Sequence, residues 1–305
     1  MKALTILLES LQERARELMF SRILMPVAFS ARCQGAAQFA EALAGRFHSE
    51  LVLLHVVLPI PAYSFQDGTP LPSDVIDDMV VQGKAQLEAF AGQSLQGIPV
   101  TQVVRVGDPA QQIVDYASAG KVDLIIMPTH GYGPFRRFLL GSVTAKVLHD
   151  ASCPVWTGPH MENAPAYPAI HFRKILCAVD LSVESRVILQ WAAGFAREYG
   201  AHLAVVHAVP SSTLDPSTVC FDPEWSTLAK KQAHERISFM GGELGITGEI
   251  AVETGDAPEA VRAFAENSAA DLLVIGRGRA TDAPGRLRTN AYAILRQAPC
   301  PVVVI

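Results

Sequence analysis

Residues Arg22–Ser30 read RILMPVAFS, and residues Lys174–Ser182 read KILCAVDLS. Three later landmarks recur in the same order: Gly107-Asp108-Pro109 with Gly255-Asp256-Ala257-Pro258, Asp123-Leu124-Ile125-Ile126 with Asp271-Leu272-Leu273-Val274, and Cys153-Pro154-Val155 with Cys300-Pro301-Val302. Paired landmarks keep a separation of about 150 residues, whereas solenoid units run to about 20 to 50 residues. The sequence therefore predicts two copies of one domain.

Each copy alternates apolar, β-rich runs with segments of helical spacing. In the first copy the pattern predicts strands over residues 23–27, 50–57, 100–106, 122–127 and 154–157, and helices over residues 36–47, 74–93, 110–119 and 142–150. The second copy repeats these elements, including strands over residues 175–179, 202–209 and 302–305. Strands that are apolar throughout are typical of a parallel sheet with both faces covered. We expect an α/β fold with two doubly wound, mostly parallel sheets.

The chain divides by composition into four segments. Residues 1–20 lie outside the repeat, and their leucine spacing predicts an amphipathic helix. Domain 1 is expected over residues 21–157 and domain 2 over residues 172–305, joined by a proline-containing linker over residues 158–171. Within domain 1, residues 59–73 are rich in proline and predict a long loop.

Bulk properties exclude several classes of protein. The chain has 305 residues, of which 50% are hydrophobic and 18% charged, so disorder is not expected. A net charge of −5 argues against a general nucleic-acid binder, which would need a basic face. No apolar run approaches the roughly 18 residues of a membrane helix, and residues 1–8 make a poor signal peptide. Five scattered cysteines without a Cys-x-x-Cys pair suit a reducing, cytoplasmic setting. Cys153 and Cys300 are expected to be buried.

The segment that carries chemistry follows the fourth strand of the first copy. Residues Pro128–Val143 read PTHGYGPFRRFLLGSV, with three glycines and two arginines before a helix that Ser142 is expected to cap. Free N–H groups at a helix start, approached closely past glycine, make a phosphate site. The alternative is a surface loop with solvated arginines.

The segment also resembles the signature of the universal stress protein family. Nucleotide-binding members of that family carry Gly, two residues, Gly, nine residues, then Gly-Ser or Gly-Thr, and Gly131, Gly141 and Ser142 match its second part. The Asp-Leu-Ile-Ile, Gly-Asp-Pro and Cys-Pro-Val segments are similar as well. The likeness covers about residues 20–157 and 172–305, so the chain resembles a tandem member.

This resemblance implies a fold of the adenine-nucleotide α-hydrolase type, with a five-stranded parallel sheet in each copy. It also implies a role in stress response or tolerance, without a catalytic reaction general to the family. Some members bind ATP, and Mg²⁺ would then accompany the nucleotide. Members commonly pair through the last strand, so the two copies are expected to pair within the chain, with a homodimer as a further form.

The two copies depart from the family pattern in opposite ways. Pro128 replaces the first motif glycine of copy one and removes an N–H donor, and Ala28 replaces an aspartate that contacts the nucleoside in binding members. Copy two keeps that aspartate as Asp180, but its loop has Arg279 at the second glycine position and Arg288-Thr289 in place of Gly141-Ser142. Four arginines in that loop either hold an anion or are solvated.

Two functions from different classes remain open. One is a stress-response regulator that binds ATP or another adenine nucleotide, chiefly in copy one; the other is a paired scaffold with both sites eroded. The resemblance assigns to nucleotide binding the following residues: Pro26, Val57, Thr129, His130, Gly131, Gly141, Ser142, Val143, Asp180, Gly276, Gly278 and Thr289. His55 and His207 are expected to be buried and hydrogen-bonded near strand ends. No catalytic group and no metal-ligand spacing is found, and slow ATP hydrolysis has no placed carboxylate to support it.

Overall fold

The computed structural model describes residues 20–59, 74–95, 97–129, 140–158, 161, 164–210, 223–278 and 289–305. Three expected features therefore lie outside the described residues: the amphipathic helix before Phe20, most of the loop over residues 59–73, and the glycine–arginine loop that includes His130 and Gly131. The chain separates into two compact units, one built from residues up to Trp156 with Met161–Ile170, the other mainly from His171–Ile305.

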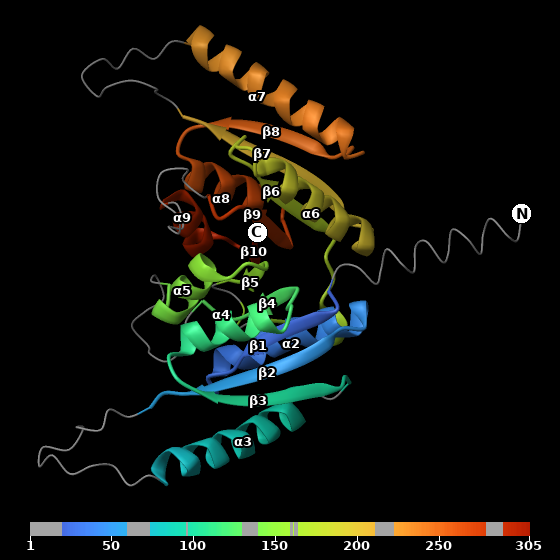
Figure 1. Ribbon diagram of the computed structural model, residues 1–305. Coiled ribbons are helices and arrows are strands. Elements are labelled where there is room, and N and C mark those ends of the chain that lie inside the picture. Colours follow the sequence, from blue (N-terminus) through green and yellow to red (C-terminus); the bar gives the residue numbers. More distant parts are fainter. Residues whose placement is uncertain are drawn as a thin grey trace, which may run out of the picture. The chain divides into compact units, whose positions relative to one another are not determined.

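Domain 1 alternates strands and helices along the chain (Figure 1). In chain order its elements are β1 (Arg22–Pro26), α2 (Ala31–Phe47), β2 (Glu50–Val57), α3 (Val75–Ser94), β3 (Val100–Val106), α4 (Pro109–Ala119), β4 (Leu124–Ile126), α5 (Ser142–Asp150) and β5 (Val155–Thr157). The strands are ordered β3-β2-β1-β4-β5, and every neighbouring pair is parallel. Strand order thus reverses between β1 and β4.

Domain 2 repeats this arrangement. Its elements are β6 (Lys174–Ala178), α6 (Ser185–Tyr199), β7 (His202–Val209), α7 (Pro223–Glu243), β8 (Glu249–Thr254), α8 (Ala257–Asn267), β9 (Leu272–Ile275), α9 (Thr289–Gln297) and β10 (Val302–Val304). The strand order is β8-β7-β6-β9-β10, again parallel throughout. The prediction of a tandem α/β fold is confirmed.

Right-handed crossovers place helices on both faces of each sheet. Because the chain steps outward from β1 to β3, α2 and α3 lie on one face, and the return to β4 and β5 places α4 and α5 on the other. The central strands are accordingly buried along nearly their whole length, as Leu124–Ile126 and Leu272–Ile275 show. Cys153 and Cys300 are buried as expected, with 8% and 5% of their surface exposed.

Equivalent turns of the two domains share unusual backbone conformations. Gly107 and Gly255, which precede α4 and α8, have φ values of 146° and 136°, a region that favours glycine because it has no Cβ. Phe29 and Leu181, which follow β1 and β6, both have positive φ, at 54° and 60°. The recurrence shows that both turns are part of the repeated design.

The predicted linker contains structure that its prolines did not suggest. A short 3-10 helix, η2 (Tyr167–Ala169), contacts α2, and the N–H of Tyr167 donates to Oε1 of Gln38 at 2.8 Å. Gly45 of α2 faces the Tyr167 hydroxyl so closely that an added Cβ would lie 3.0 Å from its oxygen. This part of the segment therefore packs on domain 1.

Candidate functional site

A cleft of about 320 Å³ opens in domain 1 at the carboxyl ends of β1, β2 and β4. Strand order reverses between β1 and β4, and ligands of open α/β sheets bind at such switch points. Pro26, Val27 and Ala28 line it from β1 and the turn that follows, and Gly141, Ser142 and Val143 line it from the start of α5. We call this the first cleft.

The start of α5 is held in place by two hydrogen bonds. The N–H of Gly141 donates to the carbonyl of Thr129 at 2.8 Å, and Oγ1 of Thr144 donates to the carbonyl of Pro128 at 3.1 Å. These bonds hold the two ends of the intervening loop together. The first N–H groups of a helix have no partner within the helix, so a polar ligand at this end meets hydrogen-bond donors.

Contrary to the expectation from the sequence, Ser142 is not the cap of this helix. Gly141 occupies the N-cap position with φ −62° and ψ 145°, Ser142 is the first helical residue, and no side chain caps the end. Glycine at the cap places no Cβ of its own at the helix start, so the cap residue does not hinder the approach of a ligand.

Only some of the residues that the sequence assigned to the site line the cleft of domain 1. Pro26, Gly141, Ser142 and Val143 line the first cleft together. Thr129 is buried beside it, and Val57 is buried at the end of β2, where its carbonyl accepts the N–H of Gly107, so neither is part of the lining. His130 and Gly131 lie outside the described residues.

Several lining residues were not assigned by motif. Met127, Ile113 and Val56 supply apolar wall, and Cys33 lies in the first turn of α2. His55 also lines the cleft, and its Nδ1 lies 2.9 Å from the carbonyl of Val27. Apolar wall residues carry no motif because core packing requires the same residue types.

Domain 2 has an equivalent second cleft of about 280 Å³ at the carboxyl ends of β6, β7 and β9. Asp180, Gly276 and Gly278 line it, as do Asn290 and Ile294 of α9. The backbone of Thr289 begins α9. His207 repeats the arrangement of His55, with Nδ1 at 2.8 Å from the carbonyl of Val179. Both histidines thus make the expected hydrogen bond, although they are only half-buried.

The carboxylate of Asp180 is held by the turn that contains it. Its Oδ1 accepts the N–H of Ser182 at 2.9 Å and the hydroxyl of Ser185 at 3.2 Å. At the equivalent place in the first cleft, the N–H of Ala28 donates to Sγ of Cys33 at 3.5 Å. The second cleft therefore has a fixed carboxylate at its rim where the first has a methyl group.

Glycine at position 276 lies close against the side chain of Ile188. A Cβ added there would lie 2.5 Å from Cδ1 of Ile188, well inside van der Waals contact. Arg277, the arginine of that loop within the described residues, is buried with 6% of its surface exposed and is not part of the cleft lining. Arg277 is therefore not placed to hold an anion in the second cleft. The other three arginines of the loop, Arg279, Arg286 and Arg288, lie outside the described residues.

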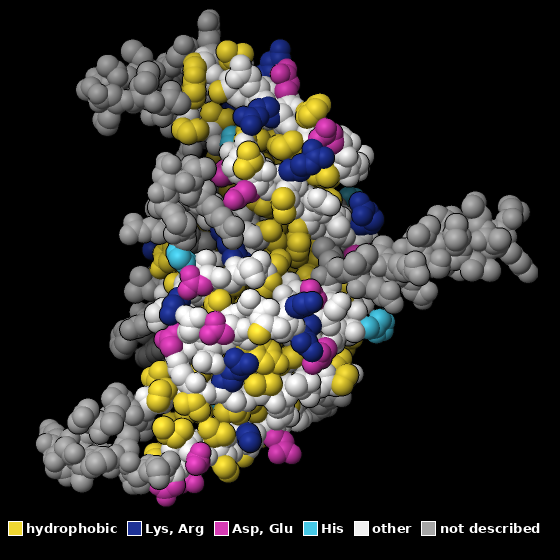
Figure 2. Space-filling model, viewed as in Figure 1, with side chains coloured by type: hydrophobic (Ala, Val, Ile, Leu, Met, Phe, Trp, Pro, Cys, Tyr) yellow, Lys and Arg dark blue, Asp and Glu magenta, His cyan; other side chains and the backbone are white. Residues whose placement is uncertain are grey.

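Electrostatic and metal-binding features are modest. On the face seen in Figure 2, described Lys and Arg side chains are interspersed with Asp and Glu. Within the described ranges, no three His, Cys, Asp or Glu side chains gather as a metal site. None of the described helices combines the length and apolar character needed to cross a membrane.

Comparison with known proteins gives a consistent result. The model of the universal stress protein family matches residues 19–157 and again residues 171–305. A universal stress protein of Thermus aquaticus is 33% identical over 139 residues, spanning 45% of this chain and 97% of that protein. The universal stress protein MJ0531 of Methanocaldococcus jannaschii is 29% identical over 144 residues, spanning 47% of this chain and 84% of that protein.

The similarity to solved structures extends over both domains. A universal stress protein from Archaeoglobus fulgidus superposes with a TM-score of 0.67, covering 93% of this chain and 95% of that one, at 23% identity. At that identity the likeness establishes the fold alone.

Proposed function

The chain belongs to the universal stress protein family, and we propose that it is a stress-response regulator whose first cleft binds an adenine nucleotide, with ATP as the first candidate. The observation that carries the proposal is the first cleft itself. Its volume of about 320 Å³ suits a small ligand. Its wall ends at a glycine-capped helix start, which favours a phosphate group.

In this proposal different residues bind the phosphates and the nucleoside, and the two clefts contribute unequally. The phosphates meet Gly141, Ser142 and Val143, and the base and sugar lie toward Pro26 and Val56. The family aspartate is absent from the first cleft because Ala28 stands there. We therefore expect micromolar rather than tighter affinity, and a smaller contribution from the second cleft, where Asp180 is kept but the glycine-capped helix start is not.

A second candidate function is a scaffold that binds no nucleotide. It is favoured by Ala28 and Pro128, which both line the first cleft and there remove one carboxylate and one N–H donor. Under this proposal the domains would present surfaces to a protein partner, and ATP would leave the thermal stability unchanged, because only a ligand that binds the native state stabilises it.

The first test is mass spectrometry of small molecules released on denaturing freshly purified protein. Stoichiometric ATP, ADP or AMP supports the regulator. An empty protein that also shows no thermal shift with millimolar ATP supports the scaffold.

Variants then locate the site. Gly141→Arg should abolish ATP binding by filling the approach to α5, while Gly92→Arg, on the exposed face of α3 where an added Cβ meets nothing within 4 Å, should leave it unchanged. Ala28→Asp should tighten binding by restoring the missing carboxylate at an exposed position. Equal binding by the wild type and Gly141→Arg would place the nucleotide elsewhere.

A further inference from the structure

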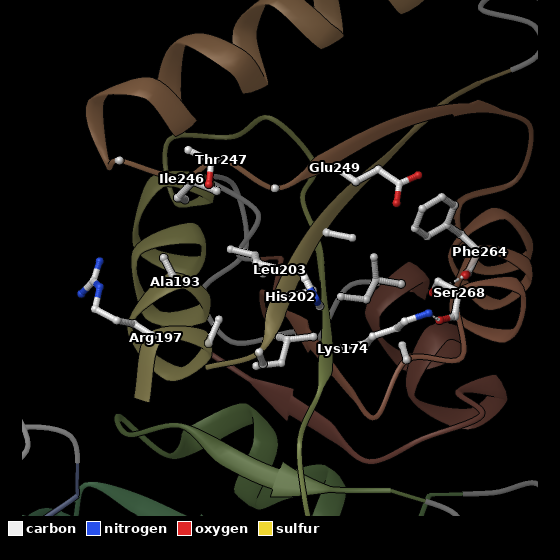
Figure 3. A pocket seen from close by; sticks show the side chains of 18 of the residues that line it. Lys174, Ala193, Arg197, His202, Leu203, Ile246, Thr247, Glu249, Phe264 and Ser268 are labelled. Carbon is white, nitrogen blue, oxygen red and sulfur yellow. Dashed lines mark hydrogen bonds between the residues drawn. The ribbon is translucent and has the colours of Figure 1, made fainter. Parts of the chain in front are cut away.

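A second kind of cavity lies at the opposite edge of domain 2, at the amino ends of β6, β7 and β8. Its volume is about 730 Å³, and its lining includes Lys174, His202, Glu249, Phe264 and Asn267. Figure 3 shows this amino-edge cavity, with Lys174 and Glu249 extending toward the side where Phe264 and Ser268 lie and Arg197 pointing away. It shares no residue with the second cleft.

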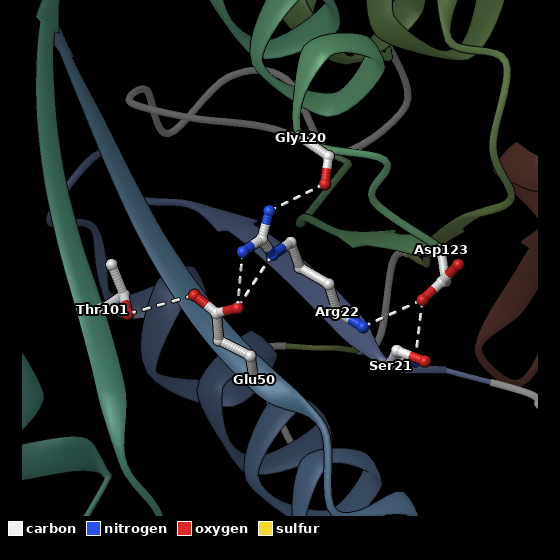
Figure 4. A network of polar contacts seen from close by, with 6 residues as sticks. All are labelled: Ser21, Arg22, Glu50, Thr101, Gly120 and Asp123. Carbon is white, nitrogen blue, oxygen red and sulfur yellow. Dashed lines mark hydrogen bonds and ion pairs between the residues drawn. The ribbon is translucent and has the colours of Figure 1, made fainter. Parts of the chain in front are cut away.

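The same edge of domain 1 carries a polar network that joins β1, β2 and β3 (Figure 4). Nε and Nη2 of Arg22 donate to Oε2 of Glu50 at 2.9 and 2.7 Å, and Nη1 donates to the carbonyl of Gly120 at 2.8 Å. The hydroxyl of Thr101 donates to Oε1 of Glu50 at 3.2 Å. Glu50 thus satisfies both its neighbours, and an incoming ligand would have to displace it.

Strand register identifies the equivalent residues in domain 2. Lys174 pairs with His202 as Arg22 pairs with Glu50. Glu249 follows on β8 at the place that Thr101 has on β3, since Ala204 pairs with Glu249 as Val52 pairs with Thr101. Both domains therefore have a cation at the first position. The carboxylate at the second position in domain 1 is replaced by an imidazole in domain 2, and the hydroxyl at the third position is replaced by a carboxylate.

The backbone frame around these residues is otherwise the same. In domain 1 the N–H groups of Ser21 and Arg22 donate to Oδ2 of Asp123, and in domain 2 those of Arg173 and Lys174 donate to Oδ2 of Asp271. Nζ of Lys174 donates to the carbonyl of Ser268 at 2.9 Å, as Arg22 does to Gly120. The two edges therefore share one backbone frame and differ in their side chains.

The exchange leaves opposite charges that do not neutralise each other. Among the described residues, neither Lys174 nor Glu249 forms an ion pair, and Lys174 uses one of its three ammonium donors on Ser268. Their strands lie two places apart, about 10 Å, with His202 between them. Lys174 can bind a carboxylate at one side of the cavity, and Glu249 can bind an ammonium group at the other. Such a site suits a molecule that carries both charges.

We propose that the amino-edge cavity binds a small zwitterion of the free amino-acid type. The ligand carboxylate pairs with Lys174, as the Glu50 carboxylate pairs with Arg22 in domain 1, and lies beside the imidazole of His202. The ligand ammonium lies toward Glu249, and the ring of Phe264 supplies apolar wall. This site is independent of the proposed nucleotide site.

Calorimetric titration of the full chain with the protein amino acids, one at a time, tests the proposal. At least one should bind, and acetate and methylamine, which each carry one of the two charges, should bind at least about tenfold more weakly. Glu249→Gln and Lys174→Met should each weaken the amino acid about tenfold or more, because each removes a charged hydrogen-bond partner.

Two matched control variants and one variant based on the equivalent residue of domain 1 complete the test. Glu253→Gln, on the same strand outside the cavity, and Lys231→Met, on α7, should leave the affinity unchanged. His202→Glu restores the carboxylate of the first domain and should abolish binding without unfolding the protein. The proposal is overturned if no amino acid binds, if acetate binds equally well, or if Glu249→Gln and His202→Glu retain the affinity. ATP titration of the same variants reports separately on the nucleotide site.

Discussion

Gly248 marks where the entrance to β8 leaves no room for a side chain. A Cβ added at Gly248 would lie 1.9 Å from the carbonyl oxygen of Leu203, and backbone atoms cannot yield as a flexible side chain does. Gly276 is less constrained, because the atom it would meet is the end of the Ile188 side chain. The two glycines therefore differ in how strictly they are needed.

Gly248→Ala is accordingly expected to destabilise the protein by about 2 kcal/mol or more through overpacking. Gly242→Ala is the matched control, because Gly242 lies in α7 with nothing within 4 Å of an added Cβ. That change should stabilise the protein by at most about 1 kcal/mol through helix propensity, because Gly242 lies next to the end of α7. Urea unfolding of the two variants measures both effects, and a Gly248→Ala protein as stable as the wild type would contradict the close approach.

Two cysteine thiols of domain 2 link its stability to pH. Burial raises the pKa of the Cys177 thiol far above its usual range, and burial together with the charge of Asp271 raises the pKa of Cys300 to about 12. The native state therefore keeps both protons while the unfolded chain releases them above pH about 8.5. Since the unfolded state then binds fewer protons, stability is lost as pH rises.

Each buried thiol should lower the free energy of unfolding by about 1.4 kcal/mol for every pH unit above pH about 8.5. The measurement is the free energy of unfolding of the wild type and of the Cys177→Ala, Cys300→Ala double variant across that range. The variant should be less stable at neutral pH but show a flatter slope. Parallel slopes would mean that neither thiol stays protonated in the native state.

Strands and helices of this chain could be predicted closely because their patterns are strong. The expected strand over residues 100–106 matches β3 without change, and the expected helix over 142–150 matches α5. The run over residues 122–127 is longer than β4, because the apolar residues Val122 and Met127 are buried beyond its ends, where Met127 keeps one backbone hydrogen bond to Trp156 at 3.0 Å. A pattern of burial therefore overstates the length of a central strand.

The candidate site could be predicted only in part. Glycine and serine motifs point to the start of α5, but the cap depends on backbone angles at Gly141 that the residue type does not fix. The linker helix η2 depends on Gln38, far away in sequence. The amino-edge cavity depends on register between strands, which a single sequence does not reveal.

The starts of α4 and α8 offer a paired test of helix capping. Asp108 accepts the N–H of Gln111 at 2.9 Å, whereas Asp256, at the same position of α8, makes no side-chain cap bond. Asp108→Ala should therefore lower the thermal midpoint measurably, and Asp256→Ala should lower it less. Equal effects of the two substitutions would mean that the observed cap bond contributes nothing.

The same cap predicts a dependence on acid. The bond from Gln111 and the neighbouring Lys146 hold the pKa of Asp108 below its usual range. The capping contribution is therefore present above the unfolded pKa of about 3.9 and is lost as pH falls through the lower native value. The difference in thermal midpoint between wild type and Asp108→Ala should disappear in strong acid.

Two domains of one fold, altered at different positions, allow each to serve as the reference for the other. The first cleft keeps the open helix start and has lost the carboxylate, and the second keeps Asp180. At the amino edge the first domain pairs Arg22 with Glu50, and the second has a cavity lined by Lys174, His202 and Glu249. Duplication followed by separate substitution therefore accounts for sites of different chemistry within one chain.

Hydrogen exchange with and without ATP tests this separation. A ligand at about 100 times its Kd stabilises the unit that binds it by about 2.7 kcal/mol, which slows exchange through unfolding of that unit about a hundredfold. We expect slower exchange in β1, β4 and α5, and a much smaller effect in β6, β9 and α9, which serve as the internal comparison. Gly141→Arg should remove the protection in domain 1. Protection of both domains to the same extent would assign the nucleotide to both clefts, and protection confined to domain 2 would assign it to the cleft that keeps Asp180.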